Sequence, residues 1–346
     1  MALIQSAWML LPVAAGLLCA EDPRAAAEAN TGLELARAGK YEQAIAHYRA
    51  ALKLNPAMPG LELNLGLAYF KLNRFAEAIN AFEQAVKAEP ASFQARVLLG
   101  MSYYETRRFR DAAVQLKRAA VEQPDNTELR FRLAQSYMWS KQYEAAKEEF
   151  RFLLTKDPDS APVHLLLGEV LDAANQQEQA TAEFEAAVKA GPHEPEAHFG
   201  LGYLYWKQKR YEEARTEMEA ELADQPQHTQ ALAYLGDAEL HSGNEERAEE
   251  HLRRALKLDA KLRLAHLDLG IVLAERNAND EAAKHLQEAI RLDPSKPDAH
   301  YRLGRLWLAM GREREAEAEF AQVKQLAKPD QPEAPPEPLI NVPRKQ

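Results

Sequence analysis

Small and apolar residues recur along this chain at an interval of 34 residues. The pattern is clearest in residues 59–92, and units of the same length run nine times without insertion or deletion, from residue 25 to residue 330. Within a unit, places 5, 9 and 12 are spaced by four and three residues, which puts them on one face of a helix. The sequence has regular helix formers and no alternating valine or isoleucine runs. The pattern therefore predicts an all-α chain of repeated units.

Two places in each unit carry small residues. Place 8 is glycine in eight of the nine units: Gly32, Gly66, Gly100, Ala134, Gly168, Gly202, Gly236, Gly270 and Gly304. Place 20 is alanine in all nine, from Ala44 to Ala316, and place 24 carries a large apolar filler such as Phe82. Small side chains let two helix backbones approach each other, whereas larger ones hold them apart. Each unit is therefore predicted to be a pair of packed helices.

This pattern resembles the tetratricopeptide repeat (TPR) family, whose 34-residue unit is a helix-turn-helix with small residues at places 8 and 20 and a proline near place 32. Proline occupies place 32 in seven units: Pro56, Pro90, Pro124, Pro158, Pro192, Pro226 and Pro294. Repeats 5 and 7 to 9 lack the usual aromatic residue at place 17. The resemblance covers residues 23–328 and implies a right-handed superhelical α-solenoid of nine tandem repeats. One such hairpin is too short to fold alone, so stacking stabilises it.

Helix boundaries are marked by a few local signals. Asp22-Pro23 is typical of a helix start, as are Ser160 before Ala161-Pro162, Glu194-Pro195, and Ser295 before Pro297. The turn inside a repeat is predicted at residues that tolerate a left-handed backbone. These are Gly39, Asn73, Asn175, Gly243, Asn277 and Gly311.

The two ends of the chain differ from the array. Residues 1–22 form a predicted leader, because the apolar run 7–20 fits the core of a secretory signal with cleavage after Ala20. This favours an exported protein, periplasmic or secreted; a cytoplasmic protein with a leading helix is the alternative. Residues 329–346 are rich in proline and are predicted to be a disordered tail. Within the tail, Leu339-Ile340-Asn341-Val342 is a candidate cover for repeat 9.

No catalytic motif is found in the sequence. It contains no G-x-S-x-G, phosphate-binding loop or C-x-x-C, and its one cysteine, Cys19, lies in the leader. His193 and His198 are one residue too far apart for a helical zinc motif. Other histidines recur at places 4 and 23 and are interpreted as packing at repeat contacts. We therefore expect no enzyme activity, no cofactor and no metal site.

Charge is unevenly distributed along the chain. The net charge is −10, and the acidity is concentrated in residues 161–250, which lie within repeats 5 to 7. Nucleic-acid binding requires a basic face. The basic clusters at 107–110 and 207–210 lie near predicted turns and are interpreted as solvated charge. The sequence therefore predicts no nucleic-acid partner, and the leader is too short for a stable membrane span.

By the resemblance, places 2, 5, 9, 12 and 13 of the first helix in each repeat line the concave face that binds peptides or partner helices. The candidate binding residues on that face are Leu63, Leu67, Phe70, Val97, Met101, Tyr104, Phe131, Met138, Trp139, Glu169, Asp172, Phe199, Tyr203, Trp206 and Asp237. They are apolar and aromatic in repeats 2 to 4, and aromatic and acidic in repeats 5 to 7. Such a face fits a partner with apolar and basic residues. The alternative is that places 5 and 12 are apolar because they are buried between repeats.

The sequence thus predicts a non-enzymatic scaffold that binds a peptide or partner helix in its concave groove. The alternative is an accessory subunit of an envelope, secretion or polysaccharide-export assembly, in which a partner supplies the chemistry. Two known TPR functions do not fit. The basic side chains of chaperone-tail clamps are missing at the matching places. The asparagine ladder of sugar-transferring TPR enzymes stops at Asn30 and Asn64, after which place 6 carries other residues.

Overall fold

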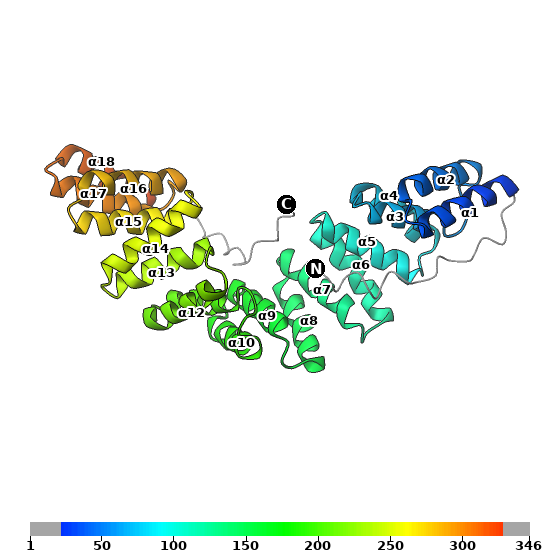
Figure 1. Cartoon of the computed structure of the whole chain (residues 1–346), viewed down its shortest axis with the longest axis horizontal. Coiled ribbons are helices and arrows are strands. Elements are labelled where there is room, and N and C mark those ends of the chain that lie inside the picture. Colours follow the sequence, from blue (N-terminus) through cyan, green and yellow to red (C-terminus); the bar gives the residue numbers. More distant parts are fainter. Residues whose placement is uncertain (1–21, 328–346) are drawn as a thin grey trace. The chain divides into compact units, whose positions relative to one another are not determined.

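The computed structural model describes residues 22–327, which form two units divided between Lys156 and Asp157. Each unit is a row of helical hairpins that follow one another in sequence (Figure 1). No strand occurs within residues 22–327. The predicted all-α array of tandem hairpins is therefore confirmed.

Unit 1 contains the first four hairpins. Its helices are α1 (Pro23–Arg37), α2 (Tyr41–Leu54), α3 (Leu61–Lys71), α4 (Phe75–Ala88), α5 (Phe93–Glu105), α6 (Phe109–Glu122), α7 (Thr127–Trp139) and α8 (Tyr143–Lys156).

Unit 2 contains the other five hairpins. Its helices are α9 (Ala161–Ala173), α10 (Gln177–Ala190), α11 (Ala197–Lys207), α12 (Tyr211–Asp224), α13 (Thr229–His241), α14 (Glu245–Leu258), α15 (Arg263–Glu275), α16 (Asn279–Leu292), α17 (Pro297–Ala309) and α18 (Glu313–Leu326).

The turn inside each hairpin has the same length and backbone shape in all nine repeats. Three residues connect the helices, and the middle one, at place 15, has a positive φ. The N–H of the third residue donates to a carbonyl five residues earlier, as from Arg210 to Tyr205, which closes the helix end. The six predicted turn residues are confirmed. Arg107, Lys141 and Lys209 adopt the same backbone conformation in the remaining repeats, although these residue types do not indicate a left-handed backbone.

Most of the predicted helix starts are confirmed. Asp22 accepts a hydrogen bond from the N–H of Arg24 at 2.8 Å, and helices begin at Ala161 and Pro297. The start predicted at Glu194-Pro195 is wrong, because α11 begins at Ala197 and Glu196 before it has a left-handed backbone with φ of 70°.

The core of each hairpin is built around places 8, 20 and 24. The nine alanines at place 20 are at most 1% exposed. At place 8, an added Cβ on Gly66 would lie 2.6 Å from the ring of Phe82, and one on Gly236 would lie 2.6 Å from Leu252. The small residues therefore provide the close helix approach that the pattern predicts.

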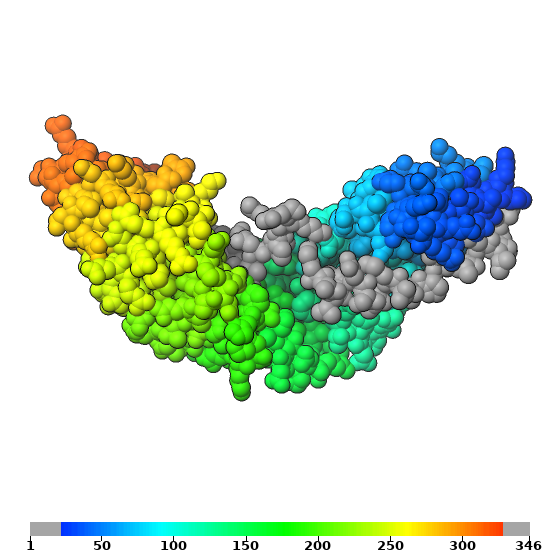
Figure 2. Space-filling view, in the orientation of Figure 1, coloured from blue at the N-terminus to red at the C-terminus, as the bar shows by residue number. Residues whose placement is uncertain are grey.

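Successive hairpins contact each other through their first helices, but their second helices do not contact one another to the same extent. In unit 2, successive first helices contact each other, namely α9 with α11, α11 with α13, α13 with α15 and α15 with α17. Over residues 22–327, the second helices make no contact of that extent with one another. The surface formed by the first helices is called the inner face below. Side chains close the spaces between successive hairpins of a unit (Figure 2).

Some predictions lie outside the described residues. These are the leader with its cleavage site, the proline-rich tail and the cover formed by residues 339–342. In residues 22–327, no helix combines the length and apolar character needed to cross a membrane.

Candidate functional site

In unit 1, the structure places the predicted residues on the first helices and buries part of them. Leu63, Val97 and Met138 are at most 8% exposed, which agrees with the alternative that such places pack between repeats. The other predicted residues of this unit are half-buried: Leu67, Phe70, Met101, Tyr104, Phe131 and Trp139.

Three of these half-buried rings also pack inside the array. The ring centroids of Phe70 and Phe75 are 5.3 Å apart, as are those of Tyr104 and Phe109, and Trp139 lies 6.2 Å from Phe109. Since these rings already stabilise their hairpins, only part of their surface is free for a partner.

In unit 2, four aromatic side chains from two successive first helices form a cluster on the inner face. Tyr234 is 5.3 Å from Tyr203, 4.8 Å from Trp206 and 6.0 Å from Phe199 between ring centroids. Phe199 is buried, whereas the other three are half-buried. The aromatic cluster, defined as Phe199, Tyr203, Trp206 and Tyr234, brings together three predicted residues. Tyr234 was not predicted, because it lies at place 6, whereas the predicted binding residues were taken from places 5, 9, 12 and 13.

One acid beside the cluster already holds a cation from the same chain. Lys207 Nζ lies 2.6 Å from Asp172 Oδ1 and 5.4 Å from the centroid of the Tyr203 ring. Burial, together with the nearby charge of Asp172, raises the pKa of Tyr203 to about 12. The inner face of repeats 5 and 6 therefore contains a site for an ammonium group, built from a carboxylate and an aromatic ring.

A second predicted acid has no such partner. Glu169 is 2% exposed, and neither of its carboxyl oxygens has a hydrogen-bond partner. Burial, with a smaller effect from the charge of Glu196, raises the pKa of Glu169 well above its ordinary value. An ionised carboxylate in such a place is costly, so Glu169 keeps its proton more readily than an exposed glutamate.

A third predicted acid lies close to another buried acid. Asp237 and Asp268 are at most 4% exposed, and Trp206 Nε1–H donates to Asp237 Oδ2. Asp268 Oδ2 has no partner. Burial raises the pKa of both groups, and for Asp268 the adjacent charge of Asp237 raises it further. Asp268, like Tyr234, lies at place 6 and was not predicted.

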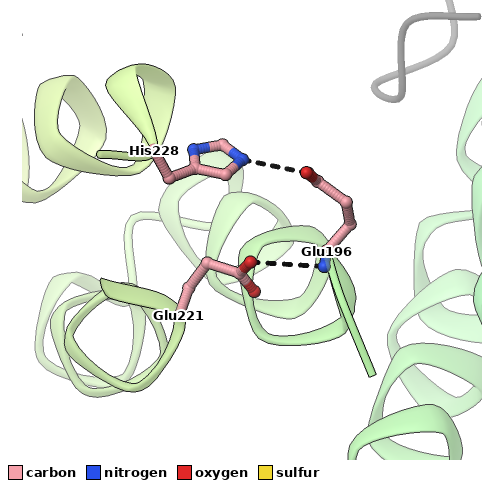
Figure 3. Close-up of side chains that lie close together, drawn as sticks. All are labelled: Glu196, Glu221 and His228. Carbon is pink, nitrogen blue, oxygen red and sulfur yellow. Dashed lines mark hydrogen bonds and ion pairs between the residues drawn. The ribbon is translucent and has the colours of Figure 1, made fainter. Parts of the chain in front are cut away.

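A polar network joins α11, α12 and α13 at the edge of this face (Figure 3). His228 Nε2 donates to Glu196 Oε2 at 3.0 Å, and His228 Nδ1 accepts from the N–H of Ala231 at 3.0 Å. Glu221 accepts from the N–H groups of Glu196 and Phe199, at 3.2 and 3.1 Å. At each of the two helix starts, a side chain therefore satisfies at least one of the free N–H groups.

The same three side chains are the one group within residues 22–327 whose donor atoms lie close enough to hold a metal ion, all within 4.8 Å. Their hydrogen bonds give each of them another role. Because His228 Nδ1 accepts a hydrogen bond, the neutral ring carries its proton on Nε2, the atom that a metal would need. We therefore interpret this group as a structural link between helices.

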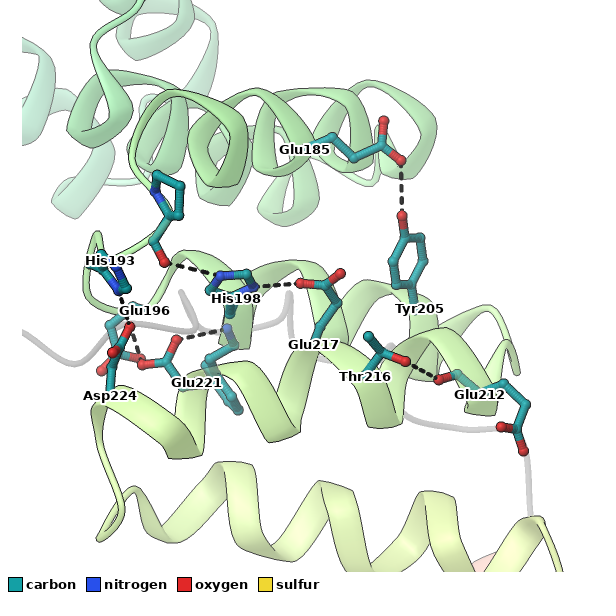
Figure 4. Close-up of polar contacts among 12 residues, drawn as sticks. Glu185, His193, Glu196, His198, Tyr205, Glu212, Thr216, Glu217, Glu221 and Asp224 are labelled. Atoms are coloured by element: carbon teal, nitrogen blue, oxygen red, sulfur yellow. Dashed lines mark hydrogen bonds and ion pairs between the residues drawn. The ribbon is translucent and has the colours of Figure 1, made fainter.

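Several of the recurring histidines connect the two helices of one hairpin, and His164, His198 and His266 also bond to the last turn of the preceding repeat, which agrees with a role at repeat contacts. His198 Nδ1 lies 2.6 Å from Glu217 Oε2, and its Nε2 bonds to the carbonyl of Pro192 (Figure 4). His164 and His300 bond to glutamates at the corresponding place 23. His193 contacts Asp224 instead, so the two imidazoles of the near-miss zinc motif have different partners.

The basic clusters are engaged near the turns. Arg108 pairs with Asp111 at 2.8 Å, and its guanidinium lies 4.3 Å from the ring of Tyr103. Arg210 has the same two contacts, with Glu213 and Tyr205. These contacts support the interpretation of the clusters as turn charge.

Comparison with known proteins agrees with the fold. Family models described as "Tetratricopeptide repeat" match residues 29–92, 63–128, 103–170, 165–227 and 201–262, and one described as "TPR repeat" matches residues 272–311. Among curated proteins, none matches the sequence.

Two of the solved structures that resemble the fold cover more than half of this chain. One is the APC/C hetero-tetramer Cut9-Hcn1, at 13% identity and TM-score 0.55, with 89% of this chain and 74% of that chain covered. The other is Pseudomonas aeruginosa pilF, at 21% identity and TM-score 0.52, with 58% of this chain and 91% of that chain covered. At these identities the likeness concerns the fold alone. The family matches and the nine hairpins together show that this chain belongs to the tetratricopeptide repeat family.

Proposed function

We propose that the protein is a non-enzymatic scaffold whose inner face in unit 2 binds a segment of a partner protein carrying apolar and basic side chains. TPR arrays generally serve as interaction scaffolds. The observation that carries the finer proposal is the aromatic cluster, whose half-buried Trp206 contacts Asp237; no lysine or arginine within residues 22–327 pairs with Asp237.

The two parts of this surface have different roles. Tyr203, Trp206 and Tyr234 are rigid side chains with exposed surface, and such residues often anchor a partner. The acids select its charge, because a basic side chain gains attraction where an acidic one would meet repulsion. The hairpins hold these groups in place before binding, so little ordering is required of the scaffold.

Peptide binding tests the proposal. The probe is acetyl-Leu-Phe-Arg-Leu-Lys-Leu-amide, and the control peptide carries citrulline for arginine and norleucine for lysine. We expect the basic peptide to change the fluorescence of Trp206, identified by loss of the signal in Trp206→Phe, and to bind at least about tenfold more tightly than the control.

Variants locate the binding surface. The double variant Tyr203→Ala, Trp206→Ala should bind the basic peptide weakly, while Tyr301→Ala, which removes an exposed tyrosine of repeat 9, should bind it normally. Glu169→Lys introduces a positive charge on the inner face and should also weaken binding. If no fluorescence change occurs and Glu169→Lys has unchanged affinity, the proposal is wrong.

We also propose that the protein is exported, on the strength of the apolar run in residues 7–20. Expressed with its own leader, the mature protein should begin at Glu21, as measured by intact mass and N-terminal sequencing. A chain that keeps residues 1–20 in the cytoplasmic fraction would contradict this.

A further inference from the structure

We propose that the apolar segment Leu339-Ile340-Asn341-Val342 folds back on repeat 9 and covers a surface of α17 and α18 whose equivalents in repeats 5 to 8 are buried. The residue types in the tail make this segment a candidate cover, and the structure identifies the surface that receives it. The inference is independent of the proposed binding function, because it concerns the last hairpin and not the aromatic cluster.

The first support is an exposed surface at the end of repeat 9. Leu308, at place 12, is 55% exposed, whereas its equivalents in repeats 5 to 8 are buried or half-buried. Phe320 and Val323, at places 24 and 27, are half-buried, whereas their equivalents are at most 2% exposed. At place 5, Tyr301 is 45% exposed, whereas its equivalents are at most 8% exposed, namely Leu165, Phe199, Ala233 and Leu267.

These four residues form one patch, called the end surface below. Tyr301 and Leu308 are seven residues apart on α17, and Phe320 and Val323 are three apart on α18, so each pair lies on one helical face. The ring centroids of Tyr301 and Phe320 are 6.2 Å apart, which joins the two helices.

In repeats 5 to 8, the next hairpin provides the burial that the end surface lacks. The second helix of each of these repeats contacts the first helix of the following one, as α16 contacts α17. The hairpin of α17 and α18 is the last one within residues 22–327 (Figure 1). Its apolar surface therefore lacks the stabilisation that removal from water gives the earlier repeats.

The second support is the chain that follows α18. This helix ends at Leu326, one turn after Val323, so the next residues start beside the end surface. Residues 329–338 include five prolines, and the apolar segment follows them directly. A proline-rich spacer spans about 3.1 Å per residue, or about 30 Å over these residues. Since α17 has 13 residues and is about 20 Å long, the segment can reach any part of the end surface.

Proline also determines the kind of cover. Pro338 and Pro343 lie on either side of the apolar segment. Proline removes a hydrogen bond from a helix interior and clashes with the preceding turn. The cover is therefore a short extended segment and not another helical hairpin.

The third support is charge. Arg305 lies on the same face of α17 as Tyr301 and Leu308, is exposed, and forms no ion pair within residues 22–327. Glu337 comes two residues before Leu339, so a segment seated on the end surface brings its carboxylate near Arg305. An exposed pair of this kind contributes little free energy. Its effect is to favour one position of the segment, which the apolar contacts then stabilise.

Hydrogen exchange measures the cover. Without residues 329–346, the amides of α17 and α18 should exchange at least about tenfold faster than in the full chain, while those of α11 and α12 stay unchanged. Because truncation alone can fray α18, the double variant Leu339→Ser, Ile340→Ser is compared as well and should have the same effect. The control Arg344→Ser, Lys345→Ser changes the tail outside the apolar segment and should behave like wild type.

A disulfide tests the contact directly. The one cysteine, Cys19, is first replaced by serine. Leu308→Cys with Ile340→Cys should then form an intramolecular disulfide in oxidised glutathione, because such a bond needs the two Cβ atoms about 4 Å apart. The control is Arg314→Cys with Ile340→Cys. Arg314 lies at place 18, which is exposed in every repeat, and this pair should react at least about tenfold more slowly.

Two further measurements identify the occupant of the end surface. A second copy of the chain would give protection of α17 and α18 that rises with protein concentration, whereas the tail gives protection independent of it. A synthetic peptide of residues 329–346, added to the truncated chain at about 1 mM, supplies the effective concentration of a short linker. It should restore slow exchange, and the same peptide with Leu339→Ser and Ile340→Ser should not.

The proposal is overturned by any of four results. These are equal exchange in wild type and in Leu339→Ser, Ile340→Ser, equal disulfide rates in the two cysteine pairs, protection that depends on concentration, and a tail peptide without effect. None of these experiments uses the basic probe peptide, so their failure leaves the scaffold proposal standing.

Discussion

At the scale of single residues, place 15 in the turn of each hairpin allows the cost of a left-handed backbone to be measured apart from side-chain contacts. Lys209 has φ of 59° there, and Gly243 has φ of 80° with nothing within 4 Å of an added Cβ. A left-handed backbone costs a residue with a Cβ about 1–2 kcal/mol, part of which glycine loses again through its flexibility in the unfolded chain.

We therefore expect Lys209→Gly to stabilise the protein by about 0.5–1 kcal/mol. Gly243→Ala should destabilise it by a similar amount, because it adds strain and no contact. Urea unfolding followed by circular dichroism measures both changes. Equal stability of the two variants would show that the turn backbone carries no strain.

His228 illustrates a residue with two structural roles. Asn126 lies at the same place 34 of its repeat, and its side chain accepts from the N–H of Leu129 at 3.0 Å, as His228 does from Ala231. We expect His228→Asn to keep this bond and His228→Ala to lose it, with a loss of about 1 kcal/mol from the bond alone. Amide exchange at Ala231 should be fast in His228→Ala and remain slow in His228→Asn; fast exchange in both would contradict the role of Nδ1.

Much of the residue-level picture could be predicted from sequence, but not all of it. Glycine and asparagine indicated six turns because they tolerate a left-handed backbone, whereas Lys209 adopts it only because the packed hairpin requires it. Pro195 predicted a helix start two residues too early, because Glu196 has a left-handed backbone and α11 begins only after it. Tyr234 and Asp268 were missed because their importance comes from neighbouring repeats, which one helix pattern does not describe.

At the scale of helices, the residues at places 8 and 24 of a repeat must fit each other in size. Gly66 lies against Phe82, which is fully buried. Adding a Cβ at Gly66 overpacks this contact, while shortening the ring leaves a void. The recurrence of both places made this pairing predictable from sequence.

A double-mutant cycle tests this dependence. Gly66→Ala and Phe82→Leu should each destabilise the protein, and the double variant should be less unstable than the sum by about 0.5 kcal/mol or more. Thermal or urea unfolding gives the four values. Gly66→Ala combined with Phe150→Leu, in a repeat that does not touch Gly66, is the control and should be additive.

At the scale of the whole molecule, buried acids should make the free energy of unfolding depend on pH. Glu169 and Asp268 have raised pKa values because they are buried. A carboxyl group with a higher pKa in the folded state binds more protons folded than unfolded. Its stabilising contribution is therefore present at low pH and is lost as pH rises through the folded pKa.

We expect the free energy of unfolding to decline as the pH rises above the ordinary pKa of an acidic side chain, and to decline less in the double variant Glu169→Gln, Asp268→Asn. Denaturant titrations at several pH values measure this. The variant Glu288→Gln, at a half-buried acid paired with Arg291, is the control. If the free energy of unfolding has the same dependence on pH in the double variant and in wild type, the two carboxyl groups do not hold their protons more readily in the folded state.

The connectors inside the hairpins have a practical consequence. All nine have three residues, the same left-handed middle position and the same closing hydrogen bond, although their side chains range from glycine to lysine. The connectors are therefore structurally equivalent. A connector from one hairpin should therefore be transplantable into another, and whole hairpins could be exchanged or added to build arrays of chosen length around the same aromatic cluster.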